Sequence, residues 1–276
     1  GDVVIQRIAA SGTLEGVPII LGSDDKCLAL PSLVADPNGF LVAWEEYRPD
    51  IALESAEHEI VGQLFDHDGV ARSMATKLNP DPEAAPPYVH GVTLAYVPDL
   101  PPQPGRYIVG WNERSWVFFA GETGTDHVKL AAFEAPETSD MPLTMTIDAS
   151  IVTPSITEDP AESYILEALI ANGAGVVACI DPGYAAYDEM FHCQRFTTGL
   201  VPFGGPIYPA ATDTAWNAES DAAFLADGSW VVVWHSTLVD GVNEGVQSQR
   251  FSSTGQALGP RRVVNRTWAE EQWFPK

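Results

Sequence analysis

The sequence predicts an all-β fold, a β-propeller of about five four-stranded blades. Three observations predict it. Two long stretches of the chain align with one another, residues 31–69 and 220–255. A short motif of the third strand recurs five times at similar spacing. Turn-forming residues separate short apolar runs along the chain, which is typical of β-strands joined by tight turns.

The two clearest copies share one order of elements. In each we expect a strand, a tight turn, a second strand that ends in Trp, a longer loop, a third strand, another turn and a fourth strand. The turns 36–39 (DPNG) and 226–229 (ADGS) carry Gly, Asn or Asp, which tolerate the positive φ that hairpin turns need. Weaker copies of the second strand occur at residues 106–111 and 175–179.

The third strand gives the spacing of the repeat. It is recognised at Gln6, Gln63, Ala131, Gln194 and Gln249, with gaps of 57, 68, 63 and 55 residues. A four-stranded unit repeated in this way is typical of propeller blades, whose inner strands surround a central channel. Trp44, Trp111 and Trp234 share one position in the repeat, and we interpret them as core residues between blades.

The two ends of the chain complicate the fifth blade. The chain begins on a third strand, and residues 272–276 (QWFPK) resemble the start of a first strand. The last blade is therefore either incomplete or completed by the chain ends, or residues 1–276 are a piece of a longer repeat array. We treat residues 1–276 as a single propeller domain. A two-sheet sandwich is the alternative, and the fivefold recurrence argues against it.

Charge and cysteine content exclude some functions. The formal net charge is −24, and a polyanion repels nucleic acid phosphates and anionic lipid surfaces. The sequence contains no run of 18 apolar residues, so it predicts no membrane-spanning helix. The three cysteines, Cys27, Cys179 and Cys193, form no CxxC pair, which argues against structural zinc. Cys179 and Cys193 fall on neighbouring strands, so a disulfide is one reading; three buried free thiols is the reading we favour.

The best-preserved repeat resembles those of a known group of proteins. It reads DGSWVVVW from Asp227 to Trp234, then QRF from Gln249, then VVN from Val263. This pattern is similar to repeats in large secreted or surface proteins of bacteria, of the calcium-associated, adhesin-like or hemolysin type. The resemblance implies an extracellular or cell-surface location and a propeller of binding type. It implies no catalytic residues.

A functional site is expected on the face that carries the loops between second and third strands. These loops are the longest in the repeat, and long loops on a rigid scaffold commonly carry binding groups. The residues that end the second strands are polar in every copy, so we expect an acid-rich ring at the channel mouth. The candidate ligand-binding residues are Glu45, Tyr47, Asn112, Arg114, Trp116, Tyr184 and His235.

Three chemistries fit such a ring. Paired carboxylates act as acid and base on glycosidic bonds, and in that case Glu46, Glu113 and Asp181 are the catalytic candidates. Several carboxylate and carbonyl oxygens also suit Ca²⁺, although no metal ligand set is identified. Aromatic residues in the loops suit stacking on sugars. The plainest reading is that these loops are merely polar and solvated.

The sequence leads to a ranked set of functions. The first is a non-catalytic extracellular binding module that recognises a carbohydrate or a protein partner, because no catalytic motif is recognised. The second is a propeller glycoside hydrolase that uses the paired carboxylates. The third is a structural subunit that assembles with other chains through the unpaired strand edges of an incomplete blade.

Overall fold

The computed structural model describes residues 2–22, 26–47, 58–80, 88–99, 104–114, 126–150, 165–181, 191–210, 217–236 and 245–264. Within these ranges the regular elements are all β-strands, which confirms the expected fold class. A search of the same residues finds no helix with the length and apolar character to cross a membrane.

The strands form separate antiparallel sheets. The first is a hairpin of β1 (Val3–Ile8) and β2 (Leu14–Leu21). The second contains β3 (Cys27–Asp36), β4 (Gly39–Tyr47), β5 (Glu59–Asp66) and β6 (Thr76–Lys77). The third contains β7 (Tyr88–Val97), β8 (Arg106–Arg114), β9 (Asp126–Glu134) and β10 (Thr144–Ser150). The fourth contains β11 (Ile165–Asn172), β12 (Gly175–Asp181) and β13 (His192–Phe196). The fifth contains β14 (Asn217–Phe224), β15 (Trp230–Ser236), β16 (Gly245–Phe251) and β17 (Arg262–Val263).

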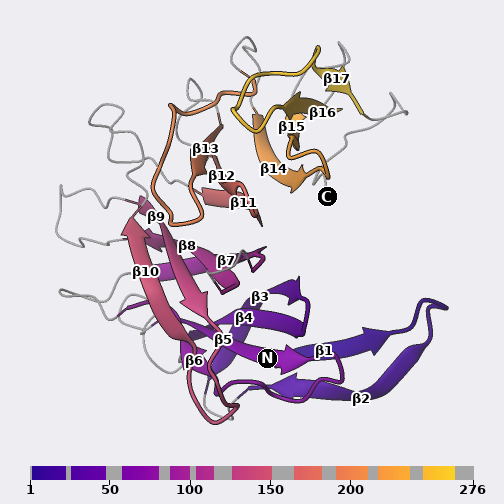
Figure 1. Ribbon diagram of the computed structural model, residues 1–276. Helices are drawn as coiled ribbons and strands as arrows, with labels where there is room; N and C mark the ends of the chain where they lie inside the picture. Colours follow the sequence, from indigo (N-terminus) through magenta and orange to yellow (C-terminus); the bar gives the residue numbers. More distant parts are fainter. Residues whose placement is uncertain are drawn as a thin grey trace, which may run out of the picture.

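The sheets follow one another along a curved path (Figure 1). The first strands of successive four-stranded units contact each other, since β3 packs beside β7, β7 beside β11 and β11 beside β14. In each of these sheets the later strands lie progressively farther from the first strand. No sheet closes on itself within the described residues, and the number of blades stays a prediction.

Each pair of neighbouring sheets encloses its own apolar cluster. Trp44 packs between the β1–β2 hairpin and the β3–β6 sheet. Trp111 packs between the β3–β6 and β7–β10 sheets, and Trp234 between the β11–β13 and β14–β17 sheets. All three indoles are buried, which confirms their interpretation as core residues between units. Side chains alternate between the two faces of a strand. One face of β4 therefore packs against the β1–β2 hairpin and the other against the β7–β10 sheet.

One turn geometry joins third and fourth strands. The turn at 66–70 is closed by Asp66 N–H to the Val70 carbonyl at 2.8 Å, and the turn at 252–256 by Ser252 N–H to the Gln256 carbonyl at 2.8 Å. Gly69 and Gly255 take φ of 84° and 82° in these turns. The turn at 197–201 places Leu200 in the same role with φ of 56°. The three turns thus share one geometry although their sequences differ, and the repeat itself stays a prediction.

Two glycines allow close backbone packing. A Cβ on Gly39 would lie 1.9 Å from the Phe65 carbonyl oxygen, so only glycine permits the β3–β4 hairpin to approach β5 here. A Cβ on Gly110 would lie 2.3 Å from a methyl of Leu166, where the β7–β10 sheet meets β11. These contacts fix the approach of one strand or sheet to the next.

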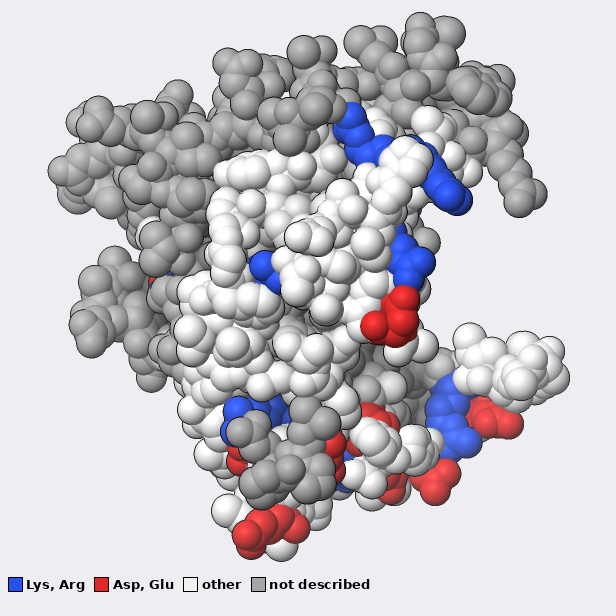
Figure 2. Space-filling view, turned by 45° about the horizontal axis from the view of Figure 1, so that its top comes forward, with Lys and Arg blue, Asp and Glu red and all other residues white. Residues whose placement is uncertain are grey.

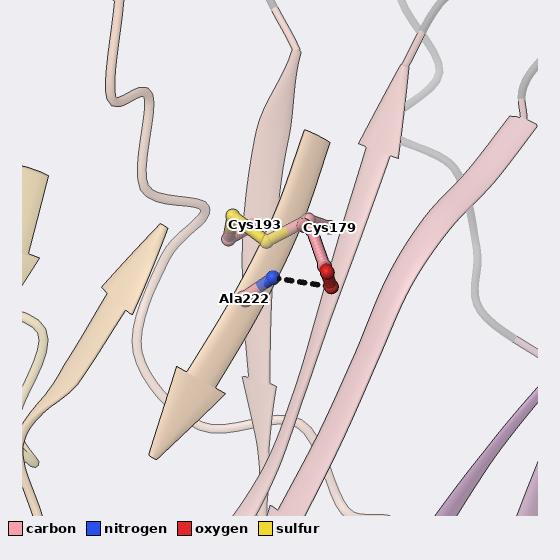
Figure 3. The surroundings of a disulfide bond; sticks show 4 residues. Cys179, Cys193 and Ala222 are labelled. Atoms are coloured by element: carbon pink, nitrogen blue, oxygen red, sulfur yellow. Dashed lines mark hydrogen bonds between the residues drawn. A yellow bond between two sulfur atoms is a disulfide. The ribbon is translucent and has the colours of Figure 1, made fainter. Parts of the chain in front are cut away.

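The cysteines correct one expectation. Cys179 and Cys193 are direct partners in the β12–β13 pairing, and they form a disulfide (Figure 3). The favoured reading of three free thiols is therefore wrong, and only Cys27 is free. Both bonded cysteines are fully buried beside Ala222 of β14. Strand register places their β-carbons on one face, which is the condition that a disulfide needs.

A strand is present at Gln6, where β1 pairs with β2; its place as the third strand of a blade stays a prediction. Residues 272–276, for which the start of a first strand is expected, lie outside the described residues. The completion of a fifth blade by the two ends therefore stays a prediction.

Candidate functional site

One position is polar and buried in four successive sheets. It is the seventh residue from the start of β4, β8 and β12, and the corresponding residue of β15. Its occupants are Glu45, Asn112, Asp181 and His235, with 4%, 2%, 5% and 0% of their surface exposed. Buried polar side chains are costly unless they are paired, so four of them at equivalent places indicate a shared role.

A break in the first strand lies opposite this position in each of the four sheets. The pairing shifts between Ala29 and Ser32, between His90 and Val92, between Leu166 and Ala168, and between Ala218 and Ser220. Leu30, Gly91 and Glu219 take positive φ inside these bulges. Bulges redirect side chains and are common beside functional sites. Here they lie on the innermost strands, next to the buried polar positions.

Glu45 pairs with a histidine from the next strand. Its carboxylate lies 2.9 Å from Nδ1 of His58, and both side chains are almost wholly buried. The ring of Tyr47 stacks on the imidazole at a centroid distance of 5.3 Å. Interaction with the Cys27 side chain, helped by burial, raises the pKa of Tyr47. Two predicted residues, Glu45 and Tyr47, are therefore brought together through His58, which no sequence motif singles out.

Glu46 is held in a charged cluster on the other face of β4. It accepts a hydrogen bond from Lys26 Nζ at 2.7 Å and another from the Trp44 indole at 2.9 Å. Lys26 also bonds Glu59 at 3.0 Å. These donors hold the carboxylate of Glu46 in one orientation.

The end of β8 joins two sheets. Asn112 Oδ1 accepts the N–H of Leu166 at 2.8 Å, so the β7–β10 sheet is bonded to β11. Glu113, the next residue, is partly exposed, and its Oε2 lies 4.0 Å from Nζ of Lys129. Asn112 and Glu113 point to opposite faces because they are adjacent in a strand.

Asp181 and His235 complete the set. Asp181 ends β12 and pairs with Ile165 at the start of β11, close to Leu166, which binds Asn112. Asp181 and Asn112 therefore approach the same end of β11 from two sheets. His235 and Ser236, at the end of β15, have no exposed surface.

Some predicted ligand-binding residues lie outside the described residues. These are Trp116 and Tyr184, together with the side chain of Arg114, whose backbone ends β8. The long loops that follow the second strands also fall there, at 48–57, 115–125, 182–190 and 237–244. On the face expected to bind a ligand, the structure therefore describes the ends of the second strands but not the loops that follow them.

The described residues hold no group of three or more His, Cys, Asp or Glu side chains that would bind a metal. Binding of Ca²⁺ stays a prediction. On the face shown in Figure 2, the acidic and basic side chains of the described residues lie in a few small groups among a larger area of other residues.

No family model and no curated protein matches the chain. The resemblance to bacterial adhesin-like and hemolysin-type repeats consequently stays a prediction.

Several solved structures are similar to this chain. One is named as a glycoside hydrolase; it is 11% identical, with a TM-score of 0.48, over 90% of this chain and 78% of that chain. An endo-arabinase from Bacteroides thetaiotaomicron is 12% identical, with a TM-score of 0.40, over 85% and 80%. An α-L-arabinanase of Cellvibrio cellulosa complexed with arabinohexaose is 12% identical, with a TM-score of 0.41, over 86% and 77%.

These names correct the first-ranked function. Several of the similar structures are named as glycoside hydrolases or arabinanases, whereas the sequence favours a non-catalytic binding module. That first-ranked expectation is wrong. The case for a particular reaction rests on the residues of this chain.

Proposed function

We propose that this protein is a glycoside hydrolase with a five-bladed propeller fold, and that its substrate is a polysaccharide. One observation carries the proposal. Three consecutive sheets each carry a carboxylate near the end of the second strand: Glu46 of β4 and Glu113 of β8 at one strand position, and Asp181 of β12 one position earlier. Glycoside hydrolysis needs two carboxyl groups, one to donate a proton and one to act as nucleophile or base.

The surroundings of these carboxylates suggest a division of roles. Lys26 and the Trp44 indole hold Glu46 in place, which suits a nucleophile or base that must keep a fixed orientation. Asp181 is buried at the end of β12, and we assign it the role of general acid. Glu113 lies on the sheet between them and is partly exposed, so it is suited to bind the sugar ring beside the scissile bond.

A disulfide supports an extracellular setting. Cys179 and Cys193 are bonded and buried. Disulfides persist mainly in oxidising compartments, which include the periplasm and the cell exterior. Polysaccharides are found in the same places. The proposed location is therefore extracellular or at the cell surface.

The test is release of reducing sugar from a panel of polysaccharides that includes arabinan and mannan. Asp181→Asn and Glu46→Gln should each lower kcat by about a hundredfold or more, since this is the usual contribution of a general acid, base or nucleophile. Glu137→Gln, which changes an exposed carboxylate away from the strand ends, is the matched control and should keep full activity.

The products distinguish two arrangements. Proton NMR of the first-formed anomer should show retention if the carboxyl groups work about 5 Å apart, and inversion if they lie roughly 6.5–9.5 Å apart. Absence of sugar release from every polysaccharide, or full activity in both variants, would contradict the proposal.

A further inference from the structure

Arg195 of β13 is a buried cation without a carboxylate partner among the described residues. It is 8% exposed. Its Nη1 donates to the Ser253 carbonyl at 3.0 Å, and its guanidinium carbon lies 4.4 Å from the centre of the Phe203 ring. Its Nε–H is buried and finds no acceptor in the described part of the chain. Burial lowers the pKa of Arg195, as expected for a charge with little compensation.

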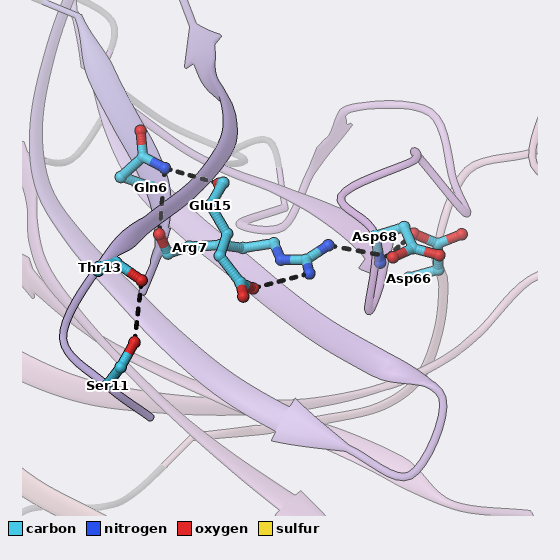
Figure 4. Close-up of polar contacts among 7 residues, drawn as sticks. All are labelled: Gln6, Arg7, Ser11, Thr13, Glu15, Asp66 and Asp68. Atoms are coloured by element: carbon cyan, nitrogen blue, oxygen red, sulfur yellow. Dashed lines mark hydrogen bonds and ion pairs between the residues drawn. The ribbon is translucent and has the colours of Figure 1, made fainter. Parts of the chain in front are cut away.

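The same position in other units carries a paired arginine. Arg7 bonds Glu15 at 3.2 Å and Asp68 at 3.0 Å, as Figure 4 shows. Arg250 bonds Asp227 and also the hydroxyl of Ser229 at 2.9 Å. Both of these arginines are more exposed than Arg195. The most buried member of the set is therefore the one that lacks its anion.

The cause lies in the preceding hairpin. In the β14–β17 sheet the turn at 226–229 (ADGS) supplies Asp227 to the arginine. In the β11–β13 sheet the corresponding turn at 172–175 reads NGAG and has no acidic residue. The β11–β13 sheet therefore has the arginine but no carboxylate in the hairpin turn beside it. A buried guanidinium without a counter-anion is costly, so an anion supplied from outside would be stabilising there.

A second unsatisfied donor lines the same space. Trp230 and Arg195 both line a pocket between the β11–β13 and β14–β17 sheets, whose free space, including its mouth, is about 240 Å³. The Nε1–H of Trp230 is buried and has no acceptor among the described residues. Phe203 and Phe224 form apolar walls. The pocket is thus lined by a guanidinium and by aromatic surface, with two buried, unsatisfied N–H groups on its lining residues.

Two glycines leave room for the guanidinium in this pocket. A Cβ on Gly204 would lie 2.5 Å from Arg195 Nη2, and one on Gly255 would lie 2.9 Å from Nε. Both glycines have positive φ, so other residues are disfavoured at these places. A fixed, planar guanidinium is the usual partner of a carboxylate, since its N–H groups match the two oxygens.

We propose that this pocket binds the carboxylate group of a small organic acid, with Arg195 and Trp230 as the donors and Phe203 against the apolar part of the ligand. The pocket lies at the hairpin-turn end of the sheets, opposite the strand ends that carry Glu46, Glu113 and Asp181. Binding there is separate from hydrolysis and does not depend on it.

The experiment is isothermal titration of the full chain with benzoate, acetate and galacturonate. Sodium chloride at equal ionic strength and neutral galactose are the reference titrants. Binding of benzoate or acetate alone identifies a free organic acid as the source, and binding of galacturonate but not galactose identifies an acidic sugar. Either result supports the site, with an affinity in the millimolar range or tighter.

The variants separate this site from surface charge. Arg195→Met should weaken carboxylate binding by about tenfold or more, because it removes charge-assisted hydrogen bonds. Trp230→Phe should also weaken it while keeping an aromatic ring. Arg250→Met is the matched control in the same motif, and it should bind as the wild type does. Arg195→Lys keeps the charge without the planar fork and serves if Arg195→Met does not fold; it too should bind more weakly.

Three results would overturn the proposal. They are no carboxylate binding by the wild type, an equal response to chloride and to carboxylates, and unchanged affinity in the Arg195 variants. None of these readouts involves sugar release, so failure here leaves the proposed hydrolase untouched.

Discussion

Asp36 shows how single residues connect the sheets. It ends β3 and accepts hydrogen bonds from the Tyr107 hydroxyl of β8 and from Arg72 Nη1, the latter at 3.0 Å. Tyr107 is buried, and burial together with the bond to Asp36 raises the pKa of its phenol. Its proton is therefore kept in the folded state well above the pH at which an unfolded tyrosine ionises.

Removing this hydroxyl tests the connection. Tyr107→Phe should lower the free energy of unfolding by about 1–3 kcal/mol, because a buried charge-assisted hydrogen bond is lost. Urea denaturation at neutral pH measures the change. A loss below about 0.5 kcal/mol would show that Arg72 alone satisfies Asp36.

The same residue gives the protein a pH dependence. The pKa of Tyr107 is raised in the folded state, so the unfolded state releases its proton first as pH rises. The contribution is fully present below about pH 10, the ordinary tyrosine value, and is lost progressively above it. Tyr107→Phe should flatten the fall in stability above about pH 10 relative to wild type. Equal slopes for the two proteins would contradict this.

At the scale of elements, Asn112 of β8 and the bulge in β11 form a joint between two sheets. The Asn112 side chain satisfies the Leu166 N–H next to that bulge. A backbone donor that leaves its own ladder must find another acceptor when it is buried. Asn112 thus has a structural role, next in sequence to Glu113 of the proposed catalytic set.

The Asn112→Ala variant measures how much this hydrogen bond contributes to the stability of the fold. It should lower the free energy of unfolding by about 1–3 kcal/mol, since the Leu166 N–H is left buried without an acceptor. Gln256→Ala, at an exposed turn position where only the backbone is bonded, is the control and should change stability little. A loss in Asn112→Ala no larger than in the control would mean that water replaces the amide.

At the scale of the whole molecule, the balance of 38 acidic and 14 basic residues dominates the electrostatics. The described charges do pair locally, as in Lys26 with Glu46 and Glu59. These pairs cannot neutralise a net charge of −24, so the folded chain repels itself.

Salt should therefore stabilise the protein. Raising sodium chloride from about 10 mM to about 500 mM shortens the screening length from roughly 30 Å to below about 8 Å. We expect the melting temperature to rise by several degrees, which corresponds to about 1–2 kcal/mol at this size. Scanning calorimetry measures it, with sucrose as an uncharged control for osmotic effects. A fall in melting temperature with salt would show that the local ion pairs outweigh the repulsion.

Much of the fold can be predicted because it is local and repeated. The turn residues at 36–39 and 226–229, and the Trp at 44, 111 and 234, act through backbone conformation and through burial in one sheet interface. Those properties depend on short segments of the chain. The same holds for the polar residues at the strand ends, which occupy equivalent positions in the repeated sequence.

The amino-acid sequence alone specifies the all-β class, the turns, the tryptophan core and the polar strand ends. Which side chains bond to one another is decided only by the tertiary structure. There Cys179 is bonded to Cys193, His58 lies against Glu45, and Arg195 lacks the carboxylate that Arg7 and Arg250 possess among the described residues. The physical reason is that hydrogen bonds and disulfides depend on distances of a few ångströms between residues far apart in the chain. Strand register and sheet packing set those distances, and no single motif encodes them.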